Sequence, residues 1–324
     1  MSKAIQIHQH GGTEVLKWED REVADPAPGE VKIRHAAVGL NFIDVYMRTG
    51  LYPLTSFPFT LGMEGSGKIE AVGEGVQGFH VGERVAYPMN AGAYAEERVI
   101  PANRIVKLPD ALSDTEAAAM MLKGMTAQYL LRRTYRVQPG DNILVYAAAG
   151  GVGLILCQWA KHLGATVIGC VGSEEKATLA KSNGCDHTIL YRTENVPERV
   201  KEITRGVGVA VSYDSIGKAT LESSLDSLKP FGTLVCFGNA SGPITDFNPG
   251  LLASKGSLYL TRPTLATHTA TRELLEDGAN ELFNVVTGGQ VKINVGQTFP
   301  LAETARAHDA LEGRNTTGST VLLP

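Results

Sequence analysis

The sequence predicts an α/β protein with two domains, one a doubly wound parallel sheet and the other a partly closed, barrel-like antiparallel domain. The chain has 324 residues, which is enough for about two domains. Beyond residue 142, strand-like and helix-like runs alternate, whereas residues 1–125 hold short strands separated by Gly, Pro and Asp. The run DNILVYAAAGGVGLILCQWAK at 141–161 joins an apolar strand to a helix through a glycine turn.

Residues 1–125 are predicted to form the antiparallel domain. Frequent glycines between Gly62 and Gly82 suit the tight bends of such a domain. A helix is expected over Ser113–Arg133, because Ser113 and Glu116 have the spacing of a capping box. The predicted strands are Ala4–His8, Val31–Val38, Gly67–Val72, Arg84–Ala86 and Ala93–Ile100.

From Asn142 onwards the pattern predicts a parallel sheet of six strands with helices on both faces. The predicted strands are Asn142–Tyr146, Thr166–Val171, Thr188–Leu190, Val207–Asp214, Thr233–Phe237 and Leu258–Leu260. The predicted helices are Val152–His162, Glu174–Asn183, Val196–Thr204, Lys218–Ser227 and a short one around Pro249–Ala253.

The segment after Arg262-Pro263 does not extend this sheet in a simple way. Two helices, Thr271–Thr287 and Leu301–Gly313, are followed by strands near Lys292–Thr298 and Ser319–Leu322. We expect them to return to the first domain. The predicted domains are therefore 1–125 with 264–324, a discontinuous domain, and 126–263.

The glycine turn, Gly150-Gly151-Val152-Gly153, is expected to bind a dinucleotide pyrophosphate through Gly150, Gly151 and Val152. Glycines let the backbone approach the phosphates, and the helix N-terminus directs N–H groups and a partial positive charge at them. The match to G-x-G-x-x-G is imperfect, because Ala148 stands at the first glycine position.

The end of the second parallel strand indicates NADP rather than NAD. NAD-binding folds place Asp or Glu there to bind the ribose 2′-OH. This chain has Gly172 and Ser173, which leave room for a 2′-phosphate, and Lys176, which can neutralise it. The alternative is that Lys176 is a solvated residue in the first turn of the next helix.

Composition argues against several classes of partner. The net charge is −4 and the pI is about 6.1, so non-specific binding of nucleic acid or of acidic membranes is not expected. No apolar run approaches the ~20 residues of a membrane span, and the polar N-terminus does not resemble a signal peptide. We therefore expect a cytoplasmic location. The four cysteines lack Cys-x-x-Cys spacing and the histidines are scattered, so no metal site is expected.

Several motifs resemble one family along essentially the whole chain. They are Gly140-Asp141, Ala148-Ala149-Gly150-Gly151 with Gly153, Gly62-Met63-Glu64-Gly65, Val81-Gly82-Glu83-Arg84-Val85, Asn41-Phe42-Ile43-Asp44 with Tyr46, Lys123-Gly124 with Thr126, Phe237-Gly238-Asn239 and Thr261-Arg262-Pro263. The chain resembles the zinc-free quinone oxidoreductases (the zeta-crystallin type) of the medium-chain dehydrogenase/reductase superfamily. The resemblance implies a GroES-like, partly open β-barrel domain beside a Rossmann domain.

A departure from the wider superfamily bears on the chemistry. Zinc-dependent members carry Cys near the position of Asn41 and His before Glu64, whereas this chain has Met63 there and no Cys before Cys157. A zinc Lewis acid is therefore not expected. A short-chain dehydrogenase mechanism is not expected either, because no Tyr is followed four residues later by Lys.

Without a metal, the acceptor must itself take electrons readily, and a quinone does. The resemblance implies transfer of reducing equivalents from NADPH to a quinone, with the two stacked in a cleft between the domains. Asn41 and Tyr46 are the expected catalytic residues and are expected to face the nicotinamide. Tyr46 is also the candidate hydrogen-bond donor to a substrate oxygen. The alternative is core packing in an apolar segment, but the resemblance favours the functional role.

The remaining candidate cofactor residues lie at strand ends or in the connecting helix. Lys123 and Thr126 are expected to contact a phosphate or ribose, although Lys123 could be merely solvated. Tyr191 follows the third parallel strand and either covers the adenine or is a surface tyrosine. The other candidates are Phe237, Gly238 and Asn239 after the fifth strand, and Arg262 and Asn315 near the cleft.

Alternative functions and the assembly state also follow from these features. The same hydride geometry serves an NADPH-dependent reductase of activated C=C bonds in enones or enals. A third hypothesis is an NADPH-binding protein with a nucleic-acid or structural role, which the acidic pI disfavours. Leu258–Leu260 is an expected edge strand, and pairing of two such edges would form a homodimer.

Overall fold

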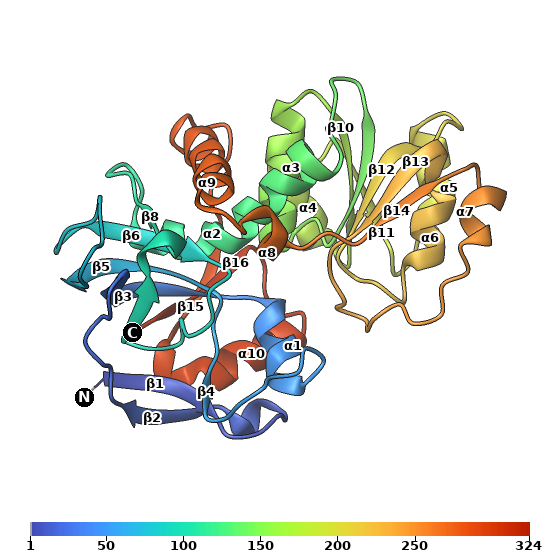
Figure 1. Ribbon diagram of the computed structural model, residues 1–324. Coiled ribbons are helices and arrows are strands. Elements are labelled where there is room, and N and C mark those ends of the chain that lie inside the picture. The colour runs from blue at the N-terminus through green and yellow to red at the C-terminus, as the bar shows by residue number, and fades with distance from the viewer. Residues whose placement is uncertain (1) are drawn as a thin grey trace. The chain divides into compact units, whose positions relative to one another are not determined.

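The computed structural model describes residues 2–324, and the chain divides into two compact units (Figure 1). The first unit comprises Met1–Met125, Thr269–Thr287 and Ile293–Pro324. The second comprises Thr126–His268 and Gly288–Lys292. Residues 264–268 thus group with the second unit, and they include the short helix α8 (Leu265–His268).

The first unit contains a seven-stranded sheet and a three-stranded sheet. The larger has the order β15-β16-β3-β5-β6-β8 with β7 paired to β3, and the smaller has the order β2-β1-β4. The strands are β1 (Ser2–Ile7), β2 (Lys17–Arg21), β3 (Glu30–Leu40), β4 (Phe59–Thr60), β5 (Glu64–Val72), β6 (Arg84–Pro88), β7 (Glu97–Pro101), β8 (Val106–Lys107), β15 (Val295–Pro300) and β16 (Ser319–Leu323). The helices are α1 (Phe42–Thr49), α2 (Asp114–Tyr129), which continues into the second unit, α9 (Arg272–Thr287) and α10 (Thr304–Glu312).

Strand β3 forms because its first half alternates buried and less buried residues, as a strand with one face on a core does. Val31 and Ile33 enter the core of the first unit together with Ile5 and Ile7 of β1. Register shifts opposite β5 bend β3 before it leads directly into α1.

The second unit is a parallel sheet of six strands in the order β11-β10-β9-β12-β13-β14. Helices α3 and α4 cover one face, and α5 and α6 cover the other (Figure 1). The strands are β9 (Asn142–Tyr146), β10 (Thr166–Val171), β11 (His187–Leu190), β12 (Val209–Asp214), β13 (Leu228–Cys236) and β14 (Tyr259–Thr261). The helices are α3 (Gly151–His162), α4 (Glu174–Ser182), α5 (Val196–Ile203), α6 (Leu221–Asp226) and α7 (Gly250–Ser254). The predicted fold class is confirmed.

Some predicted elements differ from the structure. The helix predicted over Ser113–Arg133 is α-helical only to Tyr129 and then becomes a π-helix over Leu130–Thr134. The strand predicted over Ala93–Ile100 begins only at Glu97, as β7, because the chain before it is bent: the Ala95 N–H donates to the Ala93 carbonyl at 2.7 Å. Strand β2 was not expected: its sequence, KWEDR, is mostly charged, which an exposed edge of a sheet tolerates.

Candidate functional site

The glycine turn lies where the strand order of the second unit reverses. Strands β9 and β12 are neighbours, and the chain leaves β9 for β10 on one side and enters β12 from β11 on the other. Helix α3 begins after Gly150, whose φ of −84° and ψ of 175° are extended, and no side chain caps it. The first N–H groups of α3 therefore have no side-chain acceptor, which fits a pyrophosphate at this end.

The missing first glycine is compensated by a glycine on the neighbouring strand. The Ala148 side chain is fully buried, and a Cβ added at Gly169 of β10 would lie 2.8 Å from the Ala148 Cβ. Gly153 is required for a different reason, since its Cβ would lie 2.3 Å from the Ala147 carbonyl oxygen. The turn thus keeps the close approach of helix to strand that the glycine pattern serves.

The residues expected at the 2′-phosphate do lie together after β10 and β11. Ser173 caps α4 by accepting the Lys176 N–H at 3.4 Å, and its hydroxyl also bonds the Glu175 carboxylate, which lowers the pKa of Glu175. A Cβ at Gly172 would lie 2.8 Å from the Tyr191 hydroxyl oxygen, so only glycine lets Tyr191 take this position. Tyr191 is 39% exposed, and its ring is accessible to a ligand.

Phe237, Gly238 and Asn239 follow the carboxyl end of β13, and Arg262 follows β14. The Phe237 N–H donates to the Asp214 carbonyl oxygen at 2.8 Å, which fixes the start of this loop beside the end of β12. The Asp214 carboxylate is fully buried, and it accepts hydrogen bonds from the Ile216 and Gly217 N–H groups and from the Thr220 and Ser224 hydroxyls. These donors satisfy Asp214, so we assign it to loop structure rather than to chemistry.

In the first unit, Asn41 and Lys123 bind the same buried carboxylate. The Asn41 side-chain amide donates to Glu64 Oε1 at 2.8 Å, and Lys123 Nζ approaches the same oxygen at 2.5 Å. Glu64 is fully buried, and the Lys123 side chain is 7% exposed. The Leu122 N–H donates to the other oxygen of Glu64 at 2.6 Å. Lys123 is therefore not simply solvated; Glu64 holds its ammonium and the Asn41 amide in place.

Helix α1, which carries Tyr46 and begins after Asn41, is anchored by a buried aspartate. Asp44 Oδ2 accepts the Asn41 N–H at 2.8 Å and the Tyr94 hydroxyl at 2.8 Å. Its Oδ1 has no hydrogen-bond partner within the described residues. Burial raises the pKa of Asp44 to about 7, more strongly than these two hydrogen bonds lower it. Tyr94 itself has a raised pKa, because it is buried beside Asp44.

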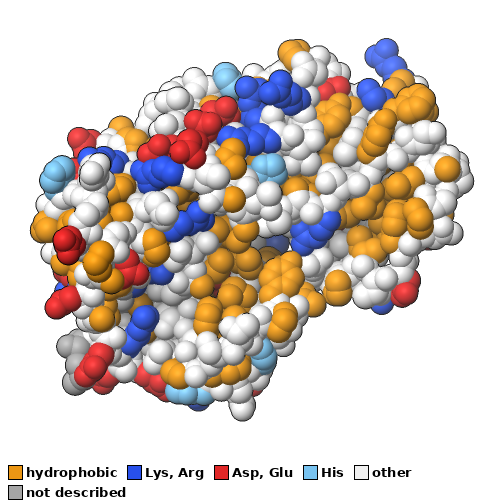
Figure 2. Space-filling view, viewed as in Figure 1, with side chains coloured by type: hydrophobic (Ala, Val, Ile, Leu, Met, Phe, Trp, Pro, Cys, Tyr) orange, Lys and Arg blue, Asp and Glu red, His pale blue; other side chains and the backbone are white. Residues whose placement is uncertain are grey.

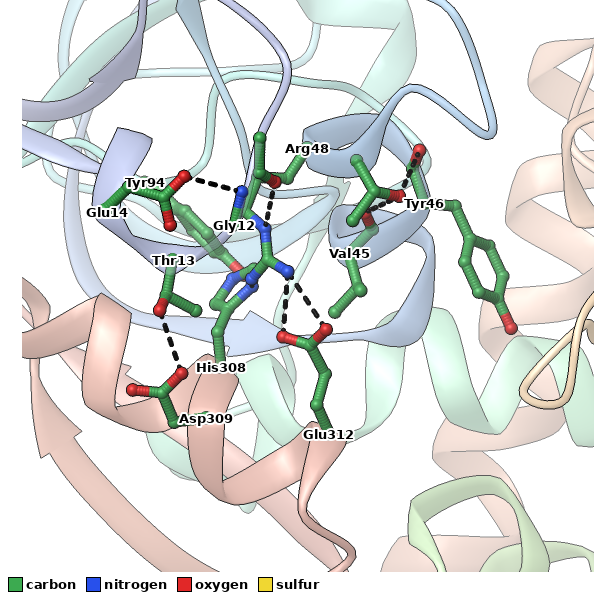
Figure 3. Close-up of polar contacts among 12 residues, drawn as sticks. Gly12, Thr13, Glu14, Val45, Tyr46, Arg48, Tyr94, His308, Asp309 and Glu312 are labelled. Carbon is green, nitrogen blue, oxygen red and sulfur yellow. Dashed lines mark hydrogen bonds and ion pairs between the residues drawn. The ribbon is translucent and has the colours of Figure 1, made fainter.

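The same anchor extends to the C-terminal helix α10 (Figure 3). His308 Nε2 lies 3.2 Å from the Tyr94 hydroxyl, and its Nδ1 lies 2.9 Å from Arg48 Nη1. Arg48 is 2% exposed and pairs with Glu312 at 2.9 Å. Burial, and then the Arg48 charge, lower the pKa of His308 to about 3, so the imidazole is neutral and can accept from Arg48.

Tyr46 points away from this anchor (Figure 3). Its side chain is 9% exposed, and its ring lies 5.3 Å from the Tyr52 ring, centroid to centroid, in an edge-on arrangement.

Asn315 follows α10, and its N–H donates to the Ala310 carbonyl at 3.0 Å. Thr126 lies in α2 and is 7% exposed.

Sequence analysis quoted Glu64 and Asp44 only as motif residues and missed Tyr94 and His308. The spacing of Asn41 and Asp44, an N-cap residue and the third helical residue, is a signal that could have identified Asp44. No local pattern marks His308, because its partner Tyr94 lies 214 positions earlier.

Metal ligands and membrane-spanning helices are the other features that bear on function. Among residues 2–324, no three or more His, Cys, Asp and Glu side chains are grouped so that they could hold a metal ion. No helix of the described chain is both long enough and apolar enough to cross a membrane.

Known protein families match both parts of the chain. Residues 27–110 match the family described as alcohol dehydrogenase GroES-like domain, and residues 151–278 match the one described as zinc-binding dehydrogenase. The chain is 54% identical to a quinone oxidoreductase of Pseudomonas aeruginosa, with 100% of both chains covered. It is 47% identical to a 2-haloacrylate reductase of a Burkholderia species, covering 100% of this chain and 99% of that protein.

A solved structure is similarly close. The crystal structure of Escherichia coli quinone oxidoreductase complexed with NADPH aligns with a TM-score of 0.98 at 48% identity, covering 99% of this chain and 100% of that one. The expected family resemblance is confirmed.

Proposed function

The chain belongs to the quinone oxidoreductases of the medium-chain dehydrogenase/reductase superfamily, and from this we infer that it is an enzyme that reduces quinones with NADPH and without a metal. The observation that supports this most strongly is the uncapped glycine turn at the strand-order reversal, in a chain so similar to a structure solved with NADPH. Zinc does not fit, because Asn41 and Met63 stand where zinc-dependent members carry ligands and no ligand cluster exists among residues 2–324.

NADPH fits the second unit, and we assign each binding residue a role there. Gly150, Gly151 and Val152 bind the pyrophosphate with backbone N–H groups. Ser173 and Lys176 bind the 2′-phosphate, and Tyr191, whose hydroxyl packs against Gly172, covers the adenine. Supporting contacts to the cofactor come from Phe237, Gly238, Asn239, Arg262 and Thr126.

In the first unit, Asn41, Tyr46 and Lys123 are the proposed residues at the reacting end, with Asn315 nearby. Bound NADPH supplies the hydride. Glu64 orients the Asn41 amide and the Lys123 ammonium, and the Asp44–Tyr94–His308 contacts fix the helix that carries Tyr46. The Tyr46 hydroxyl then donates a hydrogen bond to a quinone oxygen, where negative charge develops during reduction.

The direct test is steady-state oxidation of NADPH, and separately of NADH, in the presence of EDTA. The acceptor panel contains a benzoquinone, a polycyclic ortho-quinone, an enone and a 2-haloacrylate. We expect quinone-dependent activity that prefers NADPH and is insensitive to EDTA. Silence with every acceptor, despite NADPH binding, would refute the enzymatic function.

Cofactor preference is tested by Lys176→Ala. We expect the Michaelis constant for NADPH to rise far more than that for NADH, because only NADPH carries the 2′-phosphate. Equal effects on both cofactors would remove Lys176 from the phosphate site. The matched control is Lys181→Ala in the last turn of the same helix.

A second candidate function is reduction of activated C=C bonds. It is favoured by the 47% identity to a 2-haloacrylate reductase, whose name describes such an acceptor. The acceptor panel separates the two functions, since activity with the enone or the haloacrylate alone would select this one.

We also propose a cytoplasmic homodimer. All four cysteines are buried and free, which suits a reducing compartment. Strand β14 is an edge strand, Tyr259 on it is 61% exposed, and nearby Phe231 is 69% exposed. Figure 2 shows apolar side chains gathered over the part of the second unit that carries β14. A monomer in light scattering at micromolar concentration would contradict the dimer.

A further inference from the structure

A pocket of about 270 Å³ in the first unit has no role in the proposed reaction. It is bounded by β1, β2 and β4, by the chain at Ala91 and Gly92, and by β7. Figure 1 labels β1, β2 and β4 together in this unit. Its polar lining residues are Gln6, Arg21, Thr60 and Arg98, so two guanidinium groups line one small pocket.

Arg98 is held rigidly in the wall of this pocket. It is 6% exposed, and its guanidinium carbon lies 5.1 Å from the centre of the Tyr87 ring. Its Nη1 donates to the Asn90 carbonyl at 2.9 Å and its Nη2 to the Asn90 side-chain oxygen at 2.5 Å. The backbone at Gly92 packs against the same group, since a Cβ there would lie 3.4 Å from the guanidinium carbon. All of these partners are neutral, so none of them balances the charge.

Arg21 is half-buried and likewise lacks an acidic partner. Its Nη1 donates to the Thr60 hydroxyl at 3.3 Å, and no carboxylate of the described chain lies within ion-pair distance of Arg21 or Arg98. Burial first, and then the charge of Arg98, lower the pKa of Arg21. The two cations therefore repel each other in a site with reduced access to water.

An arrangement of this kind is unfavourable without a counter-ion. Buried charges in proteins are normally paired, and like charges that share a site destabilise it. Most other partly buried basic residues of this unit follow that rule: Lys32 pairs with Glu97 at 2.9 Å, and Arg84 pairs with Asp114 at 3.2 Å. The Arg21 and Arg98 pair departs from it, and both residues face the same pocket.

We propose that this pocket is a binding site for a phosphate group, either inorganic phosphate or the phosphate of a small phosphomonoester. Guanidinium forks match phosphate oxygens in geometry and charge. Donors remain for such a ligand: the second N–H of Arg98 Nη2, the Nε and Nη2 groups of Arg21, and the Gln6 amide, which bonds no other side chain of residues 2–324.

The size of the pocket limits the ligand. Pockets for drug-sized molecules occupy roughly 300–1,000 Å³. At about 270 Å³ and partly open, this pocket holds a phosphate with a few attached carbon atoms, not a dinucleotide. All of its lining residues belong to the first unit, whereas the proposed cofactor site lies in the second.

The test is isothermal titration of the full-length protein with sodium phosphate, at constant ionic strength adjusted with sodium chloride. Saturating NADPH is present so that phosphate cannot bind at the cofactor site. We expect saturable binding of phosphate and at least tenfold weaker binding to Arg21→Gln, a difference of about 1.4 kcal/mol. The matched control is Lys68→Gln, which makes the same change of charge at an exposed residue of β5 outside the pocket, and it should bind phosphate within twofold of the wild type.

A second variant places the counter-charge in the protein itself. Gln6→Glu should abolish phosphate binding and raise the thermal midpoint measured without phosphate, because the new carboxylate pairs with Arg21. Glycerol 3-phosphate that binds more tightly than phosphate would identify a phosphomonoester as the ligand, and weaker binding would identify free phosphate.

The proposal is overturned if the wild type shows no saturable binding or if Arg21→Gln binds as tightly as the wild type. Because Arg21 lies outside the proposed reaction site, Arg21→Gln should retain quinone-dependent NADPH oxidation. Loss of the phosphate site and loss of the proposed enzymatic function are thereby distinguishable.

Discussion

We expect Asp44→Asn to remove one defined contribution to the pH dependence of the first unit's stability, the one that Asp44 itself makes. Asp44 is fully buried, and burial raises its pKa from 3.8 to about 7. The folded chain therefore holds a proton on Asp44 at pH values at which the unfolded chain has released it. Asparagine keeps a similar shape and can accept the hydrogen bonds from Asn41 and Tyr94 through its oxygen, but it does not titrate.

The sign and size of the effect follow from the two pKa values. The folded state binds more protons than the unfolded state between about pH 4 and 7, so this group makes the free energy of unfolding fall as pH rises there. The slope is about 1.4 kcal/mol per pH unit, and it disappears above the folded-state pKa. Between pH 5 and 8 the loss amounts to about 2.6 kcal/mol. His35 and His308 are buried, and their pKa values are lowered to about 3, so they make the free energy of unfolding rise with pH. Both histidines are present in Asp44→Asn and in its parent, so their contribution cancels when the two proteins are compared.

The assay is urea unfolding at pH 5, 6, 7 and 8, followed by the fluorescence of Trp18. Trp18 packs against the core of the first unit, and the second tryptophan, Trp159, is replaced by phenylalanine in every variant so that it does not contribute. The free energy of unfolding of Asp44→Asn relative to its parent should rise by about 2–3 kcal/mol from pH 5 to pH 8. If the difference in free energy of unfolding between Asp44→Asn and its parent does not change with pH, the reasoning is refuted. The control is Asp110→Asn, at an exposed aspartate, for which that difference should not change with pH.

Three further predictions concern the two units separately. Gly153→Ala should destabilise the second unit by about 1–3 kcal/mol and weaken NADPH binding in fluorescence titrations, because its Cβ would lie 2.3 Å from the Ala147 carbonyl oxygen. Glu64→Gln should lower the free energy of unfolding by about 3–5 kcal/mol, because Lys123 loses its counter-charge; an unchanged urea midpoint would contradict this. Tyr46→Phe should lower turnover with small quinones and leave NADPH binding intact, and unchanged kinetics with several acceptors would remove Tyr46 as the donor.

The second unit could be predicted closely because its signals are local. The strand before Gly150, the glycine turn and the helix after it follow one another in the chain, and each depends on its own residues. Sequence analysis also identified Ala148 as an exception in the motif. Its compensation by Gly169 could not be predicted, because the two residues meet only when β9 and β10 pair.

The first unit was predicted less completely because its site is assembled from distant segments. Glu64 and Lys123 are 59 residues apart in the chain, and Arg48 and His308 are 260 apart. A lysine or histidine met in the sequence carries no information about such a partner. Sequence analysis therefore left open whether Lys123 is solvated, and it did not identify His308 as part of the support for α1.

By itself, the sequence determined where the chain turns, which segments are strands or helices, and which stretch offers uncapped N–H groups and a small residue to a phosphorylated cofactor. These properties depend on side-chain size and on backbone freedom within a few neighbouring residues. Only the tertiary structure decided the state of the charged groups. It raises the pKa of Asp44 and keeps His308 neutral. It also places Arg21 near Arg98 with no carboxylate of the described residues paired to either. Ionisation depends on burial and on charges brought from anywhere in the chain, and folding alone determines both.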